Sequence, residues 1–206
     1  MLKSTHADIL NKPYSQIKEL KLYCPNDLEK IKEGHKLAWQ VFKDFNLKIY
    51  QNLPMHFAKP HIENWCNGWE IRRHFFAYYK YECYLGNAPI IAIILNKQRL
   101  MVFLTWHYYK ADVSNTPLSN FNRWINEINF DEFDGFYFWH SSVDNYGNFN
   151  GMRAFDDDKV ALKQGEFYRL GKFIPKDDLD KYNDDELIEW ASETIEKLSG
   201  VYESCH

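Results

Sequence analysis

The segment 74–85 alternates between apolar positions and mixed positions. Its odd positions, from Phe75 to Leu85, are apolar or aromatic, whereas its even positions include charged side chains as well as aromatic ones. Successive side chains of a β-strand point to opposite faces of the sheet. The pattern therefore predicts a strand whose odd face packs in the core and whose even face meets water or a ligand.

Two further strands are predicted directly after this one. Residues 90–95 and 99–107 are predominantly apolar on both faces, as expected of central strands that are covered on both sides. The turn-forming pairs Gly86-Asn87 and Asn96-Lys97 separate the three segments. Because short turns join antiparallel neighbours, the middle of the chain is predicted to be an antiparallel sheet.

Apolar residues recur at helical spacing on both sides of these strands. Asn26 is a candidate N-cap for a helix over about 27–50, and Thr116-Pro117 is a start signal for a helix whose apolar stripe reaches Ile128. A helix is also predicted over 184–199, with Gly200 as its stop. The remaining predicted elements are a short helix over 62–72 and strands over 135–141, 159–163 and 167–174.

This order of elements predicts a single α+β domain over residues 1–206. We expect a mainly antiparallel sheet of about five to six strands, with N-terminal, middle and C-terminal helices packed on it. A doubly wound parallel sheet is disfavoured, because parallel strands need a crossover connection and three of these strands are joined by short turns.

The composition favours a cytoplasmic protein. No apolar run approaches the roughly 20 residues that a membrane span requires, so we expect no membrane partner. The first twenty residues lack the apolar block of a secretion signal, and the four scattered cysteines are typical of reduced thiols. The net charge of −4 disfavours nucleic acid as a partner, although a local basic patch stays compatible with it. The sequence carries no signal for an oligomeric state.

The common catalytic and metal-binding motifs are missing from the sequence. No GxGxxG follows a predicted strand, and neither GxSxG nor HExxH occurs. His56, His61 and Cys66 are spaced five residues apart, but no paired half-site accompanies them, so loop histidines are favoured over a zinc site. We therefore expect no metal site and assign no cofactor.

Two predicted strands end near the same dipeptide. Trp106-His107 lies in FLTWHYY, and Trp139-His140 lies in FYFWHSS. If the two strands are neighbours and in register, the tryptophans pair on one face and the histidines on the other. Adjacent imidazoles bind a metal or act as acid and base near neutral pH. The favoured alternative is that the histidines mark the wet rim of the sheet, since no acidic third partner is evident.

A second cluster mixes cations with aromatic side chains. Such mixtures stack on a base or clamp a phosphate. The favoured alternative is a helix end packed by tryptophan, with arginine stems covering apolar surface. The members of this cluster are Trp65, Trp69, Arg72, Arg73, His74, Tyr78 and Lys80.

The central block HFFAYYKYECYLGNAPIIAIILNKQRLMVFLTWH, residues 74–107, resembles a family of small uncharacterised bacterial proteins of similar length. Some members of that family carry the name glucose-6-phosphate dehydrogenase. The resemblance brings no catalytic residues onto this chain. The name finds no support in the residues, because the dinucleotide-binding fingerprint is missing and the chain is short for two substrate sites.

The leading functional hypothesis is a binding module for a small-molecule or nucleotide-like ligand. The side chains expected to contact the ligand are Trp106, Trp139, Tyr78 and Arg73. One alternative is a hydrolase-type enzyme in which His107 and His140 are catalytic; in the binding module the same histidines supply hydrogen bonds. Another alternative is a structural or protein-interaction role, in which the aromatic residues belong only to the core.

Overall fold

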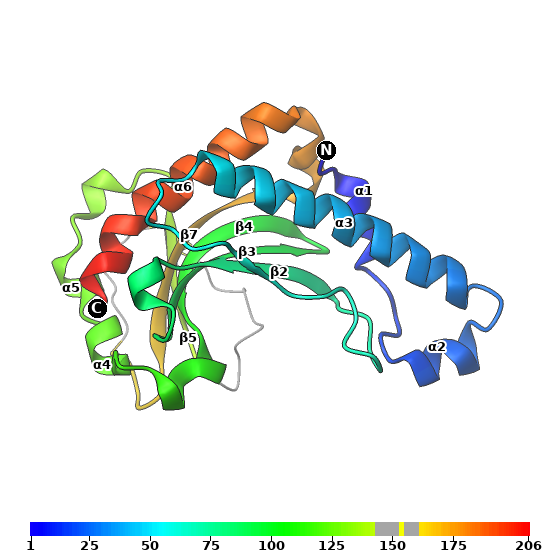
Figure 1. Cartoon of the computed structure of the whole chain (residues 1–206), viewed down its shortest axis with the longest axis horizontal. Helices are drawn as coiled ribbons and strands as arrows, with labels where there is room; N and C mark the ends of the chain where they lie inside the picture. The colour runs from blue at the N-terminus through cyan, green and yellow to red at the C-terminus, as the bar shows by residue number, and fades with distance from the viewer. Residues whose placement is uncertain (143–152, 155–160) are drawn as a thin grey trace.

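One antiparallel sheet organises the chain in the computed structural model, which describes residues 1–142, 153–154 and 161–206 (Figure 1). The strand order is β1-β2-β3-β4-β7-β5-β6, and every neighbouring pair is antiparallel. The prediction of an α+β fold with an antiparallel sheet is confirmed. The strands are β1 (His61–Ile62), β2 (His74–Tyr79), β3 (Pro89–Asn96), β4 (Arg99–Trp106), β5 (Tyr137–Ser141), β6 (Arg153–Ala154) and β7 (Phe167–Pro175).

Helices precede, interrupt and follow the strands, as the sequence predicts. In the part of the chain that the structure describes, none of them combines the length and apolarity needed to cross a bilayer. The α-helices are α1 (Ser4–Ile9), α2 (Ile17–Tyr23), α3 (Leu28–Asn52), α4 (Leu118–Phe121), α5 (Trp124–Glu127) and α6 (Asp184–Ser204). Short 3₁₀ turns cover Glu82–Tyr84, Tyr108–Val113, Phe130–Glu132 and Lys176–Lys181.

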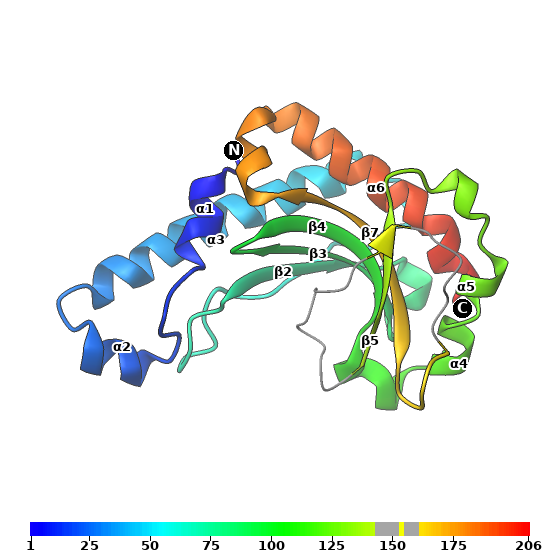
Figure 2. The ribbon, with the colours of Figure 1, turned by 180° about the vertical axis from the view of Figure 1, so that it is seen from behind.

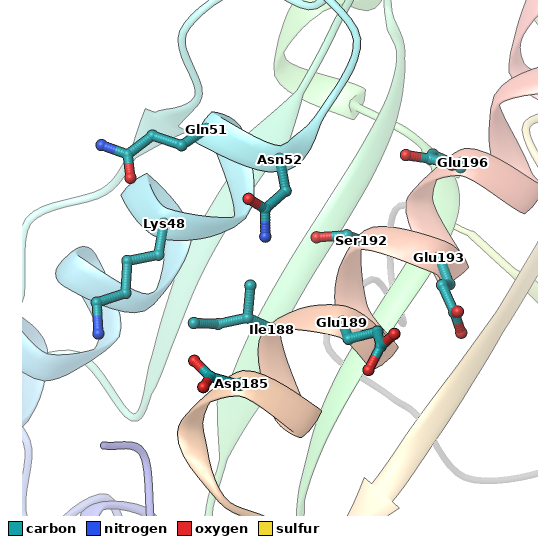
Figure 3. A pocket seen from close by; sticks show the side chains of 9 residues that line it. All are labelled: Lys48, Gln51, Asn52, Asp185, Ile188, Glu189, Ser192, Glu193 and Glu196. Carbon is teal, nitrogen blue, oxygen red and sulfur yellow. The ribbon is translucent and has the colours of Figure 1, made fainter.

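The two long helices, α3 and α6, lie over the outer face of a curved sheet (Figures 1 and 2). The start of α6 is fixed by a capping box in which Asn183 Oδ1 accepts from the Glu186 amide at 3.0 Å. In return, Glu186 Oε2 accepts from the Asn183 amide at 2.8 Å. Toward the end of α3, Asn52 faces Ser192 of α6 across the space between the two helices (Figure 3).

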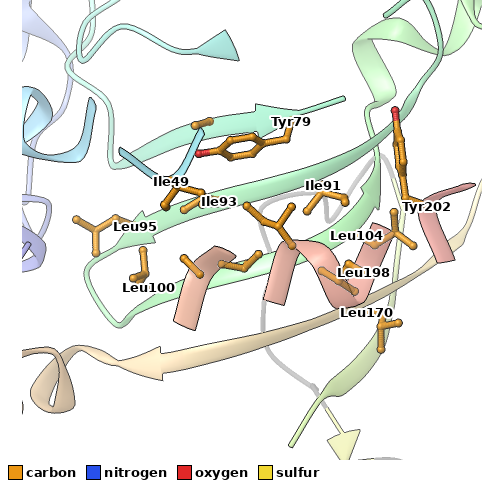
Figure 4. Packing of buried hydrophobic residues seen from close by; sticks show 14 of the residues in the cluster. Ile49, Tyr79, Ile91, Ile93, Leu95, Leu100, Leu104, Leu170, Leu198 and Tyr202 are labelled. Atoms are coloured by element: carbon orange, nitrogen blue, oxygen red, sulfur yellow. The ribbon is translucent and has the colours of Figure 1, made fainter. Parts of the chain in front are cut away.

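The main core fills the space between these helices and the outer face of the sheet (Figure 4). Alternate strand residues point into it, for example Ile91, Ile93 and Leu95 of β3, which are fully buried. Side chains spaced three or four residues apart on α3 and α6 meet them, including Ile49 and Leu198. The odd positions of β2 belong to this core, which confirms the prediction from their alternation.

The inner face of the arch has a second, smaller cluster of buried apolar residues. No described helix lies over this concave face in Figures 1 and 2. The buried members are Phe76, Ile90, Ala92, Ile94, Met101, Phe103 and Trp139. Tyr78, Tyr137 and Phe173 pack against them and are only partly buried. The even positions of β2 therefore form part of an aromatic surface distinct from the main core.

The helix predicted over 62–72 is wrong, because this segment is extended and turns back on itself. Ile62 pairs with Ala77 of β2, and an isolated bridge joins Cys66 to Ile71. Gly68 has a φ of 95°, which a helix does not accommodate. The Asn67 Oδ1 atom accepts hydrogen bonds from the backbone amides of Trp69 and Glu70, which fixes the turn locally.

Several other boundaries differ from the predictions. β2 ends at Tyr79, because residues 82–84 form a 3₁₀ turn. The helix predicted after Thr116-Pro117 is divided into α4 and α5, and α6 continues past Gly200 to Ser204. Of the strand predicted over 159–163, residues 161–163 are not extended into the sheet and the rest lie outside the described residues.

Candidate functional site

The two Trp-His pairs do not meet, because their strands are not neighbours. β7 lies between β4 and β5 in the sheet. In the register, Leu104 of β4 pairs with Leu170 of β7, and Trp139 of β5 pairs with Arg169 of β7. The expectation that the two segments pair side by side is therefore wrong. Sequence similarity between two strand ends gave no information about the strand inserted between them.

The two tryptophans are buried on opposite faces of the sheet. Trp106 belongs to the main core under the helices, where its ring centroid is 5.7 Å from that of Phe121. Trp139 belongs to the concave face and lies 5.8 Å from Phe103. The indole Nε1 of Trp139 is buried without a hydrogen-bond partner among the described residues. Trp139 thus shares the concave face with Tyr78, whereas Trp106 does not.

The two histidines are separated in the same way. His140 is exposed and is the register partner of Tyr168, whose side chain belongs to the main core. His107 directly follows β4 and packs against Tyr78 of the concave face, with ring centroids 5.3 Å apart. Two strand spacings separate β4 from β5, which is about 10 Å. The structure therefore does not bring the two imidazoles together.

Arg73 also lies apart from the other residues predicted to contact a ligand. It is exposed in the bend before β2. Five residues of extended chain separate it from Tyr78, which corresponds to about 17 Å. Among the residues predicted for the site, only Tyr78 and His107 are in direct contact with each other.

A row of rings forms around this contact at the end of the concave face. His61 of β1 stacks on Tyr78 with centroids 4.9 Å apart, because β1 pairs with β2 and places the two residues opposite each other. Tyr78 packs edge-on against His107, and His107 packs against the exposed Tyr109 at 6.0 Å. The row therefore runs from an exposed histidine through a half-buried tyrosine to a buried histidine.

Lys80 places a positive charge beside these rings. It follows β2, is only 3% exposed, and its Nζ lies 5.7 Å from the Tyr78 ring centroid. Nζ donates to the carbonyl oxygen of Leu85 at 3.0 Å and to that of Asn87. No carboxylate of the described residues forms an ion pair with it. We refer to Lys80, His107, Tyr78 and His61 together as the Lys80 cluster.

Burial disfavours the charged form of both basic groups in this cluster. Desolvation, and then the positive charge of Lys110, lower the pKa of Lys80 to about 8. Desolvation, and then the charge of Lys80, lower the pKa of His107 to about 4. At neutral pH the cluster therefore combines a protonated amine with a neutral imidazole. The Nδ1 atom of that imidazole is buried and has no hydrogen-bond partner among the described residues.

A second neutral histidine lies on the other side of Lys80. His206 stacks on Tyr84 at 3.8 Å, and its Nδ1 is 2.9 Å from both Asn87 Nδ2 and Thr116 Oγ1. Burial, and then the charge of Lys80, lower the pKa of His206 to about 4. This histidine was not predicted from the sequence, because its position beside Lys80 depends on how α6 packs against the turn that follows β2.

A buried arginine on β7 lies further along the concave face. Arg169 Nε donates to Thr105 Oγ1 at 2.9 Å, and the guanidinium lies over the rings of Phe103 and Phe167 at 5.6 and 5.4 Å. Arg169 was not predicted from the sequence either, because Thr105 and Phe103, which it contacts, lie on β4, more than sixty residues earlier in the chain. Its position makes the concave face both aromatic and cationic.

The described residues contain no group of three or more His, Cys, Asp or Glu side chains arranged to hold a metal ion. The cysteines at positions 24, 66, 83 and 205 are free thiols. What the Lys80 cluster can supply chemically is therefore a positive charge, hydrogen-bonding imidazole atoms and aromatic faces.

Comparison with known proteins places the chain in a family. A protein-family model matches residues 2–205. A protein of Haemophilus influenzae (strain ATCC 51907 / DSM 11121 / KW20 / Rd), described as "Uncharacterized protein", is 35% identical over 206 residues, which cover 100% of this chain and 98% of that protein. The similarity thus extends well beyond the central strands that carried the resemblance in the sequence. The chain belongs to this family of small bacterial proteins, whose model spans nearly its whole length.

Proposed function

We propose that the protein binds a small anionic ligand with a planar part at the Lys80 cluster. This is the ligand-binding hypothesis of the sequence analysis, centred on different residues. Tyr78 and His107 stay in the proposed site, Lys80 and His61 join it, and Trp139 lies further along the same concave face. Trp106 and Arg73 lie elsewhere and are not part of the proposal.

The observation that supports the proposal most directly is the buried ammonium group of Lys80. A buried charge is costly unless it is both paired with an opposite charge and hydrogen-bonded. Lys80 has two carbonyl partners but no counter-charge among the described residues. An anionic ligand would supply the missing negative charge and would stabilise the protonated amine.

The groups around Lys80 indicate two further properties of the ligand, a hydrogen-bonding group and a planar part. His107 Nδ1 is buried without a described partner, and His107 itself is only 9% exposed. An unsatisfied buried polar atom costs about 1–3 kcal/mol, so a ligand that forms this hydrogen bond gains affinity. The His61, Tyr78 and Tyr109 rings lead from the surface to this point and can stack on a planar group. Carboxylates and phosphates attached to a flat ring combine these properties.

Direct acid–base cooperation between His107 and His140 has no geometric basis here. Such chemistry requires hydrogen-bond reach, or one bridging water, between each group and the reacting atoms. The two side chains lie on opposite faces of the sheet with β7 between their strands. The hydrolase-type alternative is therefore not part of the proposal.

Isothermal titration calorimetry on the full chain tests the proposal, with benzoate, inorganic phosphate and AMP as probes. We expect at least one probe to bind to the wild type, and Lys80→Met to weaken that binding about tenfold or more, as expected for loss of a charged hydrogen bond. Lys36→Met removes one charge from an exposed position on α3 and should leave binding unchanged.

The pH dependence provides an independent check. Since the pKa of Lys80 is about 8, binding should weaken as the pH rises above that value. A Lys80→Met protein that binds the probe as tightly as the wild type would contradict the proposal, as would a wild type that binds none of the three probes.

A further inference from the structure

A groove of about 670 Å³ lies between the C-terminal half of α3 and the first three turns of α6, away from the Lys80 cluster. One wall is formed by Lys48, Gln51 and Asn52 of α3 (Figure 3). The other wall belongs to α6, which presents four carboxylates to the groove. Those carboxylates are Asp185, Glu189, Glu193 and Glu196.

The groove has a strong excess of negative charge. Among the described residues that line it, Lys48 carries the single positive charge, and its Nζ is 3.5 Å from Asp184, which lies outside the groove. None of the four lining carboxylates takes part in an ion pair within the part of the chain that the structure describes. Like charges three or four residues apart on a helix repel each other. A bound cation would relieve this repulsion.

A buried hydroxyl group at the floor of the groove is a second, independent observation. Ser192 is 7% exposed, and its Oγ is buried without a hydrogen-bond partner among the described residues. In a helix, a serine hydroxyl commonly donates to the carbonyl oxygen four residues earlier, and here no such bond is formed. Figure 3 shows the Ser192 side chain directed toward Asn52 across the groove. A group that satisfies this oxygen would have to come from within the groove.

We infer that the α3–α6 groove binds a linear polyamine. Glu189 and Glu196 lie on either side of Ser192 on the same face of α6, three residues before it and four residues after it. At a rise of 1.5 Å per residue, these spacings are about 4.5 and 6 Å. A triamine with a three-carbon and a four-carbon spacer, such as spermidine, matches this unequal spacing, with its terminal ammonium groups at the carboxylates and its central amine donating to Ser192 Oγ.

The geometry favours an extended organic cation over a metal ion. A divalent metal needs several oxygen ligands converging on one point. The four carboxylates are instead distributed along three turns of α6, and the described residues contain no cluster of three acidic, histidine or cysteine side chains around a common point. The charges of a polyamine are distributed along its length in the same manner.

Calorimetric titration of the full chain with spermidine tests this inference. We expect saturable binding at one site, and binding about tenfold weaker or more for the double variant Glu189→Gln/Glu196→Gln. Ser192→Ala should weaken spermidine binding by a similar factor, because it removes the acceptor for a charged donor. Circular dichroism would establish that both proteins retain the fold.

The controls separate a defined site from general attraction to an acidic protein. Glu33→Gln removes one exposed carboxylate near the other end of α3, about 22 Å from Lys48 along the helix, and should leave spermidine affinity unchanged. Propylamine should bind far more weakly than spermidine. The inference is overturned if Glu33→Gln reduces affinity as much as the groove variants do. It is equally overturned if Mg²⁺ displaces spermidine at equal concentration, or if no spermidine binds to the wild type.

Discussion

Replacing Lys80 by methionine should remove a pH-dependent part of the stability of the protein. Methionine has a similar length and no charge, so it fills the same space beside Tyr78. The pKa of Lys80 is lowered from its usual value of 10.5 to about 8, chiefly by burial. Between these two values the unfolded chain binds the proton more readily than the folded chain does, so the stability of the wild type rises with pH.

The expected size of this effect follows from the shift in pKa. Each unit corresponds to 1.36 kcal/mol, so the full shift is worth about 3 kcal/mol. Most of it, about 2.5 kcal/mol, should be gained between roughly pH 7 and pH 10. Below about pH 7 both states are protonated and the difference between wild type and variant should level off.

Urea unfolding of the wild type and of Lys80→Met at a series of pH values measures this difference. Subtraction removes the contributions of the titrating groups that Lys80 does not influence, while His107 and His206, whose pKa values burial and Lys80 lower to about 4, are neutral over this pH range. It also separates the pH-dependent term from the constant loss of the hydrogen bonds to Leu85 and Asn87. A free-energy difference between the two proteins that stays constant from about pH 7 to pH 10 would contradict this expectation, because Lys80 would then have the same pKa in the folded and the unfolded protein.

Four further variants test other parts of the structure. Since burial lowers the pKa of His107 to about 4, the free energy of unfolding should fall as the pH drops from about 6.5 toward 4. His107→Gln should reduce that fall by up to about 3 kcal/mol in acid unfolding curves. Equal pH dependence of the free energy of unfolding in both proteins would argue against a neutral buried imidazole. Gly171→Ala should destabilise the protein by about 3 kcal/mol or more in urea unfolding, because the added Cβ would lie 2.3 Å from the Val102 carbonyl oxygen. Gly200→Ala in α6 places a Cβ where no atom lies within 4 Å, so it should stabilise the protein by about 0.5–1 kcal/mol. The opposite order of melting temperatures would show that the β4–β7 contact is not tight. Asn183→Ala should lower the free energy of unfolding by about 1 kcal/mol through loss of the α6 cap, and no change would mean that another group caps the helix.

Much of the fold could be predicted because local patterns determined it. The alternation in β2 reflects the burial of one face of the strand in the main core, and the apolar runs of β3 and β4 reflect burial on both faces. The turn between β3 and β4 is marked by its turn-forming residues. The helix 62–72 could not be rejected from spacing alone, because Ile62, Trp65 and Trp69 recur at helical spacing and a short extended chain can carry the same residues. Pairing with β2 and the positive φ of Gly68 decided between the two.

The candidate site was predictable only in part. Tyr78 and His107 were identified from their aromatic surroundings, and they are in contact. Lys80 was included in a cluster at the other end of its strand, where its role as a buried cation was not evident. His206 and Arg169 could not be identified from local sequence patterns, since their hydrogen-bond partners Asn87 and Thr105 come from distant segments of the chain.

The central strands, the amphipathic helices and the α+β class could be predicted from local patterns, because they depend on periodicity within short segments. The position of β7 between β4 and β5, the opposite faces of the two tryptophans and the burial of Lys80 beside His107 and His206 follow from the packing of the whole chain. Periodicity specifies which face of a strand is buried, but it does not specify which strand lies next to it. Strand order and desolvation depend on the combined packing of segments that are far apart in the chain.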